Sequence, residues 1–204
     1  MGGHLFIFDD QPIDDGTLPR IDVPPPGPIG LDARTGTPAR AHVNIGERVV
    51  RYPRQRMGQR VGDGECFSLA DGALRNAGAR TAEDYGTVAP DLDYVWGSSV
   101  SLADLQPGDV VQFRDYRFDR EVETRNADGS FTTTSDVQER PHHTAIVERV
   151  DGGGAVTVLE QNSPDGSPVT RSQLFFSGGT RRSGNRTTTI TVQGRFWFYR
   201  PQAR

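Results

Sequence analysis

The chain has a single cysteine, Cys66, which opens an apolar segment directly after Gly62-Asp63-Gly64-Glu65. A cysteine attacks only as a thiolate, and a helix N-terminus or a neighbouring imidazolium favours that form. The free amides of a helix's first turn can also stabilise an oxyanion. Cys66 is therefore a candidate nucleophile, although a lone cysteine is more often a small buried apolar residue. Other groups must decide between these interpretations.

Two adjacent histidines, His142 and His143, open a later apolar run and could supply a base for the thiol. Strand alternation places His143 on the same face as Ala145 and Val147, whereas His142 points to the opposite face. His143 is therefore the preferred base. Its second ring nitrogen needs a partner that fixes the tautomer and the orientation of the ring.

An acid and an amide, Glu160 and Asn162, close the next apolar run. They lie two residues apart, so their side chains share one face of a strand, and Gln161 points away. Either Glu160 or Asn162 could orient the imidazole, and the sequence alone does not choose between them. Together with Cys66 and His143, these residues have the composition of a thiol-dependent acyl-transfer site.

Residues beside these groups are expected to border a substrate. Gly64 would let a substrate backbone approach the thiol. Glu65 is expected to point outward or to seat a substrate amine, because an inward carboxylate would oppose thiolate formation. His142 is also assigned to substrate binding.

The elements that must position these groups begin with a helix from Cys66 to Ala77, whose apolar positions recur at three- and four-residue spacing and which ends at Gly78. A second helix is expected within residues 43–59, kinked or ended by Pro53. Strands are expected at 110–113, 143–150, 155–161, 187–192 and 194–200.

The polar segment 114–140 has a hairpin tip at 126–129, and its length suggests an inserted flap near the cleft. Helices that precede strands predict an α+β domain, in which the helix bearing the nucleophile packs on a mainly antiparallel β-sheet.

Composition restricts the function classes. The net charge of -4 argues against nucleic-acid binding, and one cysteine excludes an intrachain disulfide and a multi-thiolate zinc site. No apolar stretch approaches the ~20 residues that span a bilayer, so no membrane partner is expected. Because all 23 basic residues are arginine, lysine chemistry is excluded. Neither a metal nor a cofactor is expected.

We expect two parts: a Pro-rich, loosely structured N-terminal extension over residues 1–42 and a catalytic domain over 43–204. The first residues lack the basic leader of a signal peptide, so the protein is expected to be cytoplasmic as synthesised. Export, if it occurs, would use a route other than Sec.

Four blocks resemble the CHAP amidases, relatives of NlpC-type cell-wall peptidases among the papain-like cysteine hydrolases. They are Gly64-Glu65-Cys66 with its helix, Leu105–Val111, His143–Val147 and Glu160–Asn162. The resemblance covers about residues 45–165. It implies Cys66 as the nucleophile, His143 as the base, and Glu160 and Asn162 in the orienting positions.

The resemblance also implies amide hydrolysis through a thioester acyl-enzyme, without a cofactor, on peptidoglycan peptides or related amide bonds. Two alternatives stay open. One is a cytosolic isopeptidase or acyl transferase acting on proteins or small amides, and the other is an inert binding module with the same scaffold. The sequence identifies neither an inhibitor nor a delivery partner.

Overall fold

A computed structural model describes residues 44–204 of the chain. The expected extension over residues 1–42, with a short strand at Leu5–Phe8, lies outside the described residues. Its boundary with the catalytic domain therefore stays a prediction.

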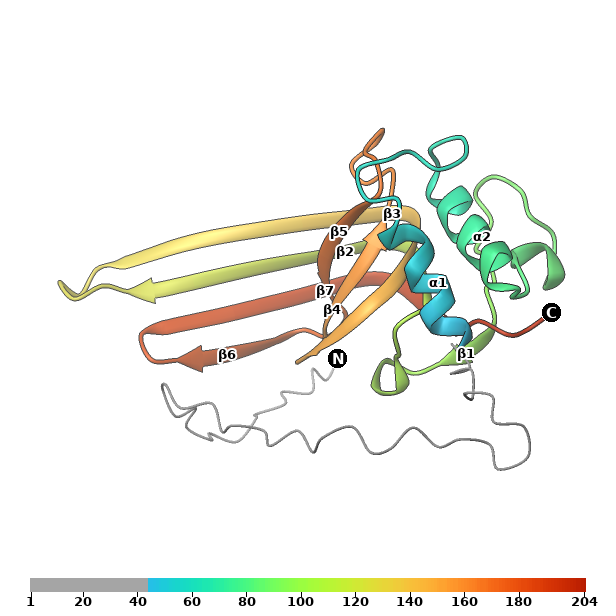
Figure 1. Cartoon of the computed structure of the whole chain (residues 1–204). Coiled ribbons are helices and arrows are strands. Elements are labelled where there is room, and N and C mark those ends of the chain that lie inside the picture. Colours follow the sequence, from blue (N-terminus) through green and yellow to red (C-terminus); the bar gives the residue numbers. More distant parts are fainter. Residues whose placement is uncertain (1–43) are drawn as a thin grey trace, which may run out of the picture. The chain divides into compact units, whose positions relative to one another are not determined.

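The described part contains two α-helices, two 3₁₀ turns and seven strands (Figure 1). The helices are α1 (Ile45–Arg54) and α2 (Cys66–Ala77), and the 3₁₀ turns are η1 (Ala82–Asp84) and η2 (Leu102–Asp104). The strands are β1 (Ser98–Val100), β2 (Val110–Arg125), β3 (Phe131–Gly152), β4 (Ala155–Glu160), β5 (Thr170–Phe175), β6 (Gly179–Ser183) and β7 (Arg186–Arg200).

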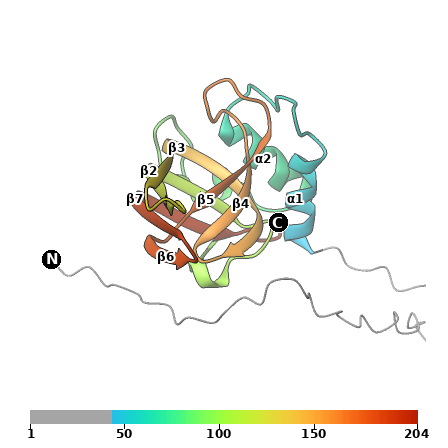
Figure 2. The same ribbon diagram turned by 90° about the vertical axis from the view of Figure 1, so that its left-hand side faces the viewer.

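All strands belong to one antiparallel sheet in the order β1-β7-β2-β3-β4-β5, and β6 pairs with β7 outside this path. Figure 2 shows the sheet strongly curved, with α1 and α2 together on one side. On β3, pairing with β4 begins only at Ile146. Among the described residues, the earlier part of β3 therefore has a strand neighbour, β2, on one edge only.

The α+β expectation is wrong, because strands dominate the described residues. Strands account for 47% of them and helices for 17%. Much of the excess comes from segments 114–140 and 179–183, which are polar and for which no strand was predicted. Their backbone groups are instead satisfied by pairing with neighbouring strands, and local hydrophobic alternation does not reveal that pairing.

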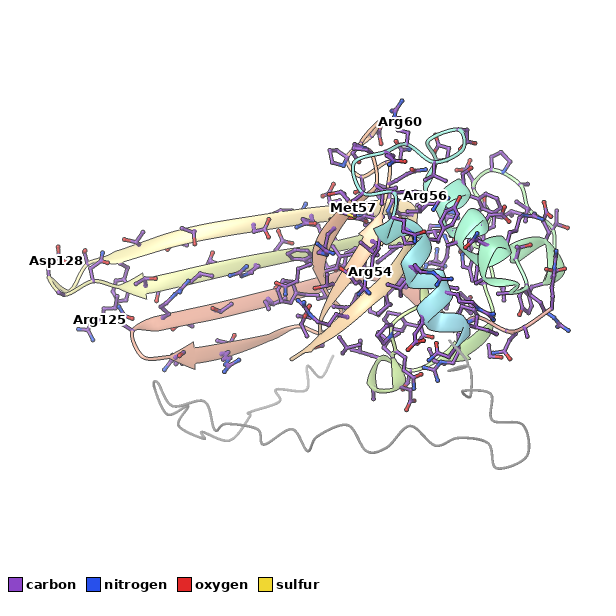
Figure 3. All side chains as sticks on the ribbon, viewed as in Figure 1. Arg54, Arg56, Met57, Arg60, Arg125 and Asp128 are labelled. Atoms are coloured by element: carbon purple, nitrogen blue, oxygen red, sulfur yellow. The ribbon has the colours of Figure 1, made fainter. Side chains whose placement is uncertain are left out.

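The long β2–β3 hairpin turns at residues 126–129, as predicted. It does not lie over the helices as a flap near the cleft would. Together with β6 and the first half of β7, it extends away from α2 as an arm (Figure 1). Figure 3 shows Arg125 and Asp128 at the outer end of this arm.

The expected pair of C-terminal strands is one continuous strand, β7. Gly194, predicted to open the second of these strands, has φ +88, and the β2–β7 register shifts between Arg114 and Arg117 at this point. A Cβ on Gly194 would lie 2.1 Å from the carbonyl oxygen of Asp115. The glycine therefore allows the two backbones to approach at a bulge, and the chain does not reverse.

Helix α2 has the predicted bounds and ends at Gly78, whose φ of 71 is left-handed. Its buried face contributes Leu69, Ala73 and Leu74 to a core cluster shared with strand residues such as Ile146. Small side chains on this face let the helix lie close to the sheet. The cluster thus holds the start of α2 beside β3.

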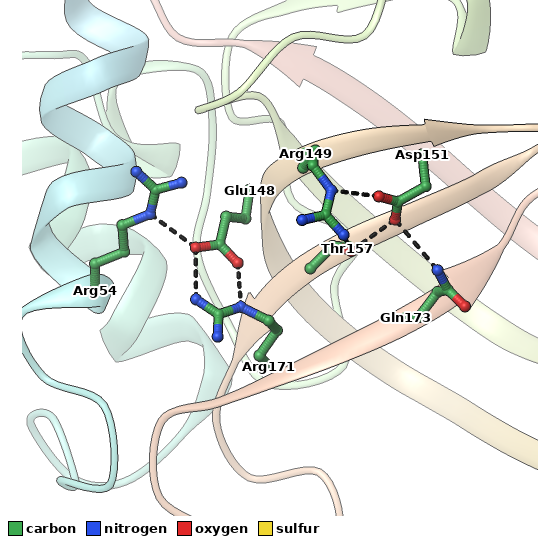
Figure 4. A network of polar contacts seen from close by, with 7 residues as sticks. All are labelled: Arg54, Glu148, Arg149, Asp151, Thr157, Arg171 and Gln173. Carbon is green, nitrogen blue, oxygen red and sulfur yellow. Dashed lines mark hydrogen bonds and ion pairs between the residues drawn. The ribbon is translucent and has the colours of Figure 1, made fainter. Parts of the chain in front are cut away.

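Helix α1, which ends one residue after Pro53, is tied to the sheet by Glu148 of β3 (Figure 4). The buried Glu148 carboxylate accepts from Arg54 Nε at 2.7 Å and from Arg171 Nη2 of β5 at 2.8 Å. These bonds hold the pKa of Glu148 below its ordinary value against the opposing effect of burial, with Arg171 contributing most.

Candidate active site

The nucleophile candidate, Cys66, is the first residue of α2 and is half-buried. The residue before it, Glu65, is the N-cap but makes no side-chain capping bond. The loop is held instead by Asp63, which accepts from the Glu65 amide at 3.0 Å and from the Ser68 hydroxyl at 2.6 Å. The first-turn amides at Cys66 are thus free of side-chain caps and suited to an anion.

His143 on β3 is 4% exposed, and its Nε2 lies 3.0 Å from Glu160 Oε2. The Cys66 thiol is near enough to the same imidazole to raise its pKa. Because Nε2 faces Glu160, Nδ1 is the nitrogen left for the sulfur. The structure therefore brings three of the predicted residues, Cys66, His143 and Glu160, into one chain of contacts.

A fourth group in this chain of contacts, Arg140, was not predicted from the sequence. Its Nε and Nη2 donate to the two oxygens of Glu160 at 2.9 and 2.6 Å, and it is only 6% exposed. Regular alternation would put Arg140 and His143 on opposite faces of β3. Asp115 of β2 and Pro141 of β3, however, are not paired in the β2–β3 ladder, and Asp115 has a φ of +53. This local irregularity lets both side chains reach Glu160.

These contacts shift two pKa values in opposite directions. Burial alone would lower the pKa of His143, but hydrogen bonds and charge interactions with Cys66 and Glu160 raise it to about 9. Burial alone would raise the pKa of Glu160, but His143 and Arg140 lower it to about 2. A charged imidazolium beside an ionised carboxylate that also faces Arg140 accounts for both directions.

Asn162 does not contact the imidazole. Its φ is +62, and its side chain donates to Glu65 Oε2 at 2.9 Å and accepts from the Gly166 amide at 2.6 Å. The strand ends at Glu160, so the expected alternation no longer applies at residue 162. Asn162 thus binds the exposed side chain of Glu65, while Glu160 contacts His143.

Gln161, expected to point away, is fully buried and bonded to the loop before α2. Its Oε1 accepts from the Val61 amide at 2.9 Å, and its Nε2 donates to the carbonyls of Val61 and Glu65 at 2.9 and 2.7 Å. Gln161 therefore joins the strand that carries Glu160 to the loop that leads into Cys66. No local sequence signal indicates such a contact across about a hundred residues.

The other substrate-binding candidates lie around Cys66. His142 Nε2 is 2.8 Å from the Leu92 carbonyl, and its ring packs near Tyr94 with centroids 5.7 Å apart. Tyr94 also contacts the ring of Phe67, which follows the thiol. Gly64 has φ +95 in the loop before α2. His142 therefore supports an aromatic wall on one side of Cys66.

A surface hollow of about 690 Å³ is bordered by Arg140, the residue that binds Glu160. Its remaining lining comes from β3 residues 137–139, segment 163–170, Ser172 and the turn at Met57 and Gly58. Figure 3 shows Met57 between the end of α1 and the loop bearing Arg60. A second surface depression, near Arg200, shares no residue with the Cys66 site.

Within residues 44–204, no three His, Cys, Asp or Glu side chains are grouped closely enough to hold a metal ion. In the same part of the chain, no helix has the length and apolarity needed to cross a membrane. The described donor set at Cys66 consists of a thiol, an imidazole, a carboxylate and a guanidinium, which suits acid–base and nucleophilic chemistry.

Comparisons with known proteins give a family and one relative. Residues 24–178 match the AIM3/BBC1 cysteine proteinase-fold domain, so the match begins within the expected extension. The chain is 31% identical over 169 residues to "Altered inheritance of mitochondria protein 3" of Debaryomyces hansenii. That alignment covers 76% of this chain and 17% of the relative, so the chain corresponds to a small part of that protein. No solved structure matches the chain.

The matched family supports the papain-like kinship implied by the sequence motifs, although it does not show the specificity of CHAP or NlpC amidases for peptidoglycan. The matched residues include Cys66, His143 and Glu160. The chain belongs to the AIM3/BBC1 cysteine proteinase-fold domain family.

Proposed function

We propose that this domain is a cysteine hydrolase that cleaves an acyl bond, most simply a peptide or isopeptide amide, through a thioester on Cys66. The observation that carries the proposal is the buried His143–Glu160 pair, joined at 3.0 Å, with Cys66 at the start of α2 near enough to raise the pKa of that imidazole. A thiol at a helix start, beside an imidazole held by a buried carboxylate, has the composition and order of an activated nucleophile.

The proposed reaction has two stages. Cys66 attacks the carbonyl carbon as a thiolate, and first-turn amides of α2 stabilise the oxyanion. His143, as imidazolium, protonates the departing amine while the C–N bond breaks. The imidazole, now neutral, then takes a proton from water, which attacks the thioester and releases the acid and the thiol.

A polypeptide substrate is supported by the backbone beside the site. Arg140, three residues before His143 on β3, borders the hollow. At that point one edge of β3 has no neighbouring strand among the described residues. An unpaired strand edge can bind an extended peptide through main-chain hydrogen bonds. The narrower peptidoglycan proposal rests on the CHAP-like sequence blocks alone.

The first test is the alkylation rate of Cys66 by iodoacetamide at pH 6, followed by mass spectrometry. The same chain in urea is the matched control, because an unfolded thiol has a pKa near 8.5 and under 1% thiolate at that pH. We expect the folded chain to react at least about tenfold faster. A folded rate equal to or below the urea rate would contradict the proposal.

The second test identifies the bond. The protein and its Cys66→Ala variant are incubated with a peptide library cut from a cell extract and, separately, with purified peptidoglycan, and new termini are identified by mass spectrometry. Cleavage of peptides by the wild type only supports the proposal. Cleavage of peptidoglycan would choose the narrower substrate, and fast alkylation without turnover of either substrate would favour an inert binding module.

A further inference from the structure

We propose that Arg140 is a positioning residue for the Cys66–His143 pair, acting by holding Glu160 as a fixed, ionised acceptor for the imidazole. This inference rests on the proposed function. It adds a group that the nucleophile, base and acid arrangement does not itself require.

The Arg140 guanidinium binds both oxygens of Glu160 and is itself held by further hydrogen bonds to neighbouring residues of β3. Two parallel bonds of 2.9 and 2.6 Å join its Nε and Nη2 to the two oxygens of Glu160. Its Nη1 also donates to the Glu139 carbonyl at 2.8 Å, and its Nη2 to Gln138 Oε1 at 3.1 Å. Because both ends of the guanidinium are held, Glu160 cannot rotate without breaking a charged bond.

Charge balance gives Arg140 a second role. In the ion-pair state the order of charged groups is the Cys66 thiolate, the imidazolium, the carboxylate and the guanidinium. Their charges therefore alternate in sign and sum to zero. Without Arg140, two anions would share one cation around a Glu160 side chain that is 0% exposed. A buried, uncompensated carboxylate is costly and takes up a proton instead.

Other charged or titratable groups near this series do not take the place of Arg140. Tyr116 faces it from β2, but burial raises the pKa of its phenol, which donates to the Phe175 carbonyl at 2.6 Å. The Glu139 side chain is over half exposed and pairs with Arg117 at the surface. Tyr94, near the thiol, also has its pKa raised by burial and stays neutral.

The test follows the pH dependence of Cys66 alkylation in Arg140→Met, which preserves side-chain length without charge. A protonated Glu160 cannot stabilise the imidazolium, so the acid limb of the alkylation profile should move upward by at least about one pH unit. The alkylation rate at pH 6 should then fall about tenfold. Ring ¹⁵N shifts of His143 at pH 7 should change from imidazolium to neutral imidazole.

Three variants keep the test decisive even if Arg140→Met folds poorly. Arg140→Lys retains the charge and should recover part of the rate. Glu160→Gln should lose as much rate as Arg140→Met. The double variant Arg140→Met/Glu160→Gln contains no buried charge in either position, so it should regain stability in urea but not the alkylation rate.

A folded Arg140→Met or double variant with a wild-type alkylation profile and wild-type His143 shifts would overturn the positioning role. So would an Arg140→Lys variant no faster than Arg140→Met. Slow alkylation in the wild type at every pH would instead defeat the proposed function, and the two failures are therefore distinguishable.

Discussion

At the residue scale, the site around the imidazole of His143 brings together side chains from three elements. Cys66 comes from the start of α2, Glu160 from the end of β4, and His143 itself from β3. The ring is 4% exposed, so its charge depends on these partners rather than on water. The protonation state of one side chain thus reports whether the elements are correctly assembled.

The pH dependence of two reactions separates the roles of Cys66 and His143. Amide cleavage needs the imidazolium to protonate the leaving amine, and the pKa of His143 is raised to about 9. Cleavage is therefore expected to decline above about pH 9. Alkylation by iodoacetamide needs only the thiolate, because iodide leaves without a proton, and its rate should not decline there.

This prediction is checked by measuring both rates on one preparation between pH 6 and 10.5, with circular dichroism at each pH as a control for unfolding. Parallel declines of both reactions in a folded protein would remove His143 from the role of proton donor.

At the element scale, Gln161 connects the end of β4 to the loop before α2. Replacing it with Leu removes three hydrogen bonds and leaves the Val61 amide without a partner inside the protein, whereas the Val61 carbonyl still accepts from the Gly64 amide. One buried unsatisfied group costs about 1–3 kcal/mol, so a loss of about 2 kcal/mol is expected. Urea denaturation measures this loss.

Asn162→Gly is the matched control for Gln161→Leu. It keeps the positive φ at residue 162 and removes a half-buried side chain. We expect it to lose less than half as much stability as Gln161→Leu. Equal losses would show that the loop does not depend on the buried amide.

Two glycines with almost the same φ allow the cost of a steric clash between backbones to be separated from the cost of a strained backbone conformation. Gly194 has φ +88 and lies where a Cβ would meet the Asp115 carbonyl at 2.1 Å, whereas Gly129 has φ +86 and open space around it. Gly129→Ala should cost about 1 kcal/mol from the left-handed backbone alone. Gly194→Ala should cost at least about 2 kcal/mol more, because β2 and β7 must separate.

The difference between the two alanine variants is measured by thermal and urea denaturation. A Gly194→Ala variant as stable as Gly129→Ala would mean that the bulge can open without cost. That result would contradict the description of β7 as a strand held against Asp115.

At the scale of the whole molecule, the site couples stability to pH on both sides of neutrality. Glu160 has its pKa lowered to about 2, so its contribution is present above about pH 4.5 and is lost as the pH falls towards 2. His143 has its pKa raised to about 9, so its contribution is present below about pH 6.5 and is lost as the pH rises through 9. The free energy of unfolding should therefore decline in both windows.

Glu160→Gln should flatten the acid decline and reduce the alkaline one, because it removes the carboxylate and one of the two partners that raise the pKa of His143. Each window is worth at most about 3 kcal/mol for a shift of this size. Asp128→Asn is the control, since Asp128 is a carboxylate at the arm's exposed tip. Urea denaturation from pH 2.5 to 10 checks the result, and equal curves for wild type and Glu160→Gln would contradict it.

Much of the helical part and of the site could be predicted from local pattern. The stripe of small apolar residues predicts α2 with its observed bounds, and Gly78 marks its end. Local pattern failed where strands are polar. The strand at 187–192 was predicted, but segments 114–140 and 179–183 of the arm carry threonine and charged residues on exposed faces, and their local pattern does not distinguish a paired strand from a loop.

The sequence by itself determined that a thiol opens a helix, and that a histidine and an acid lie on separate strands further along the chain. Those are local properties, set by periodicity and capping. Only the tertiary structure decided that Glu160 and not Asn162 faces the imidazole, that Arg140 holds that acid, and that Gln161 ties the loop to β4. These contacts join residues 17 to 100 positions apart, so they depend on sheet register and a local irregularity at Pro141, which no short-range pattern encodes.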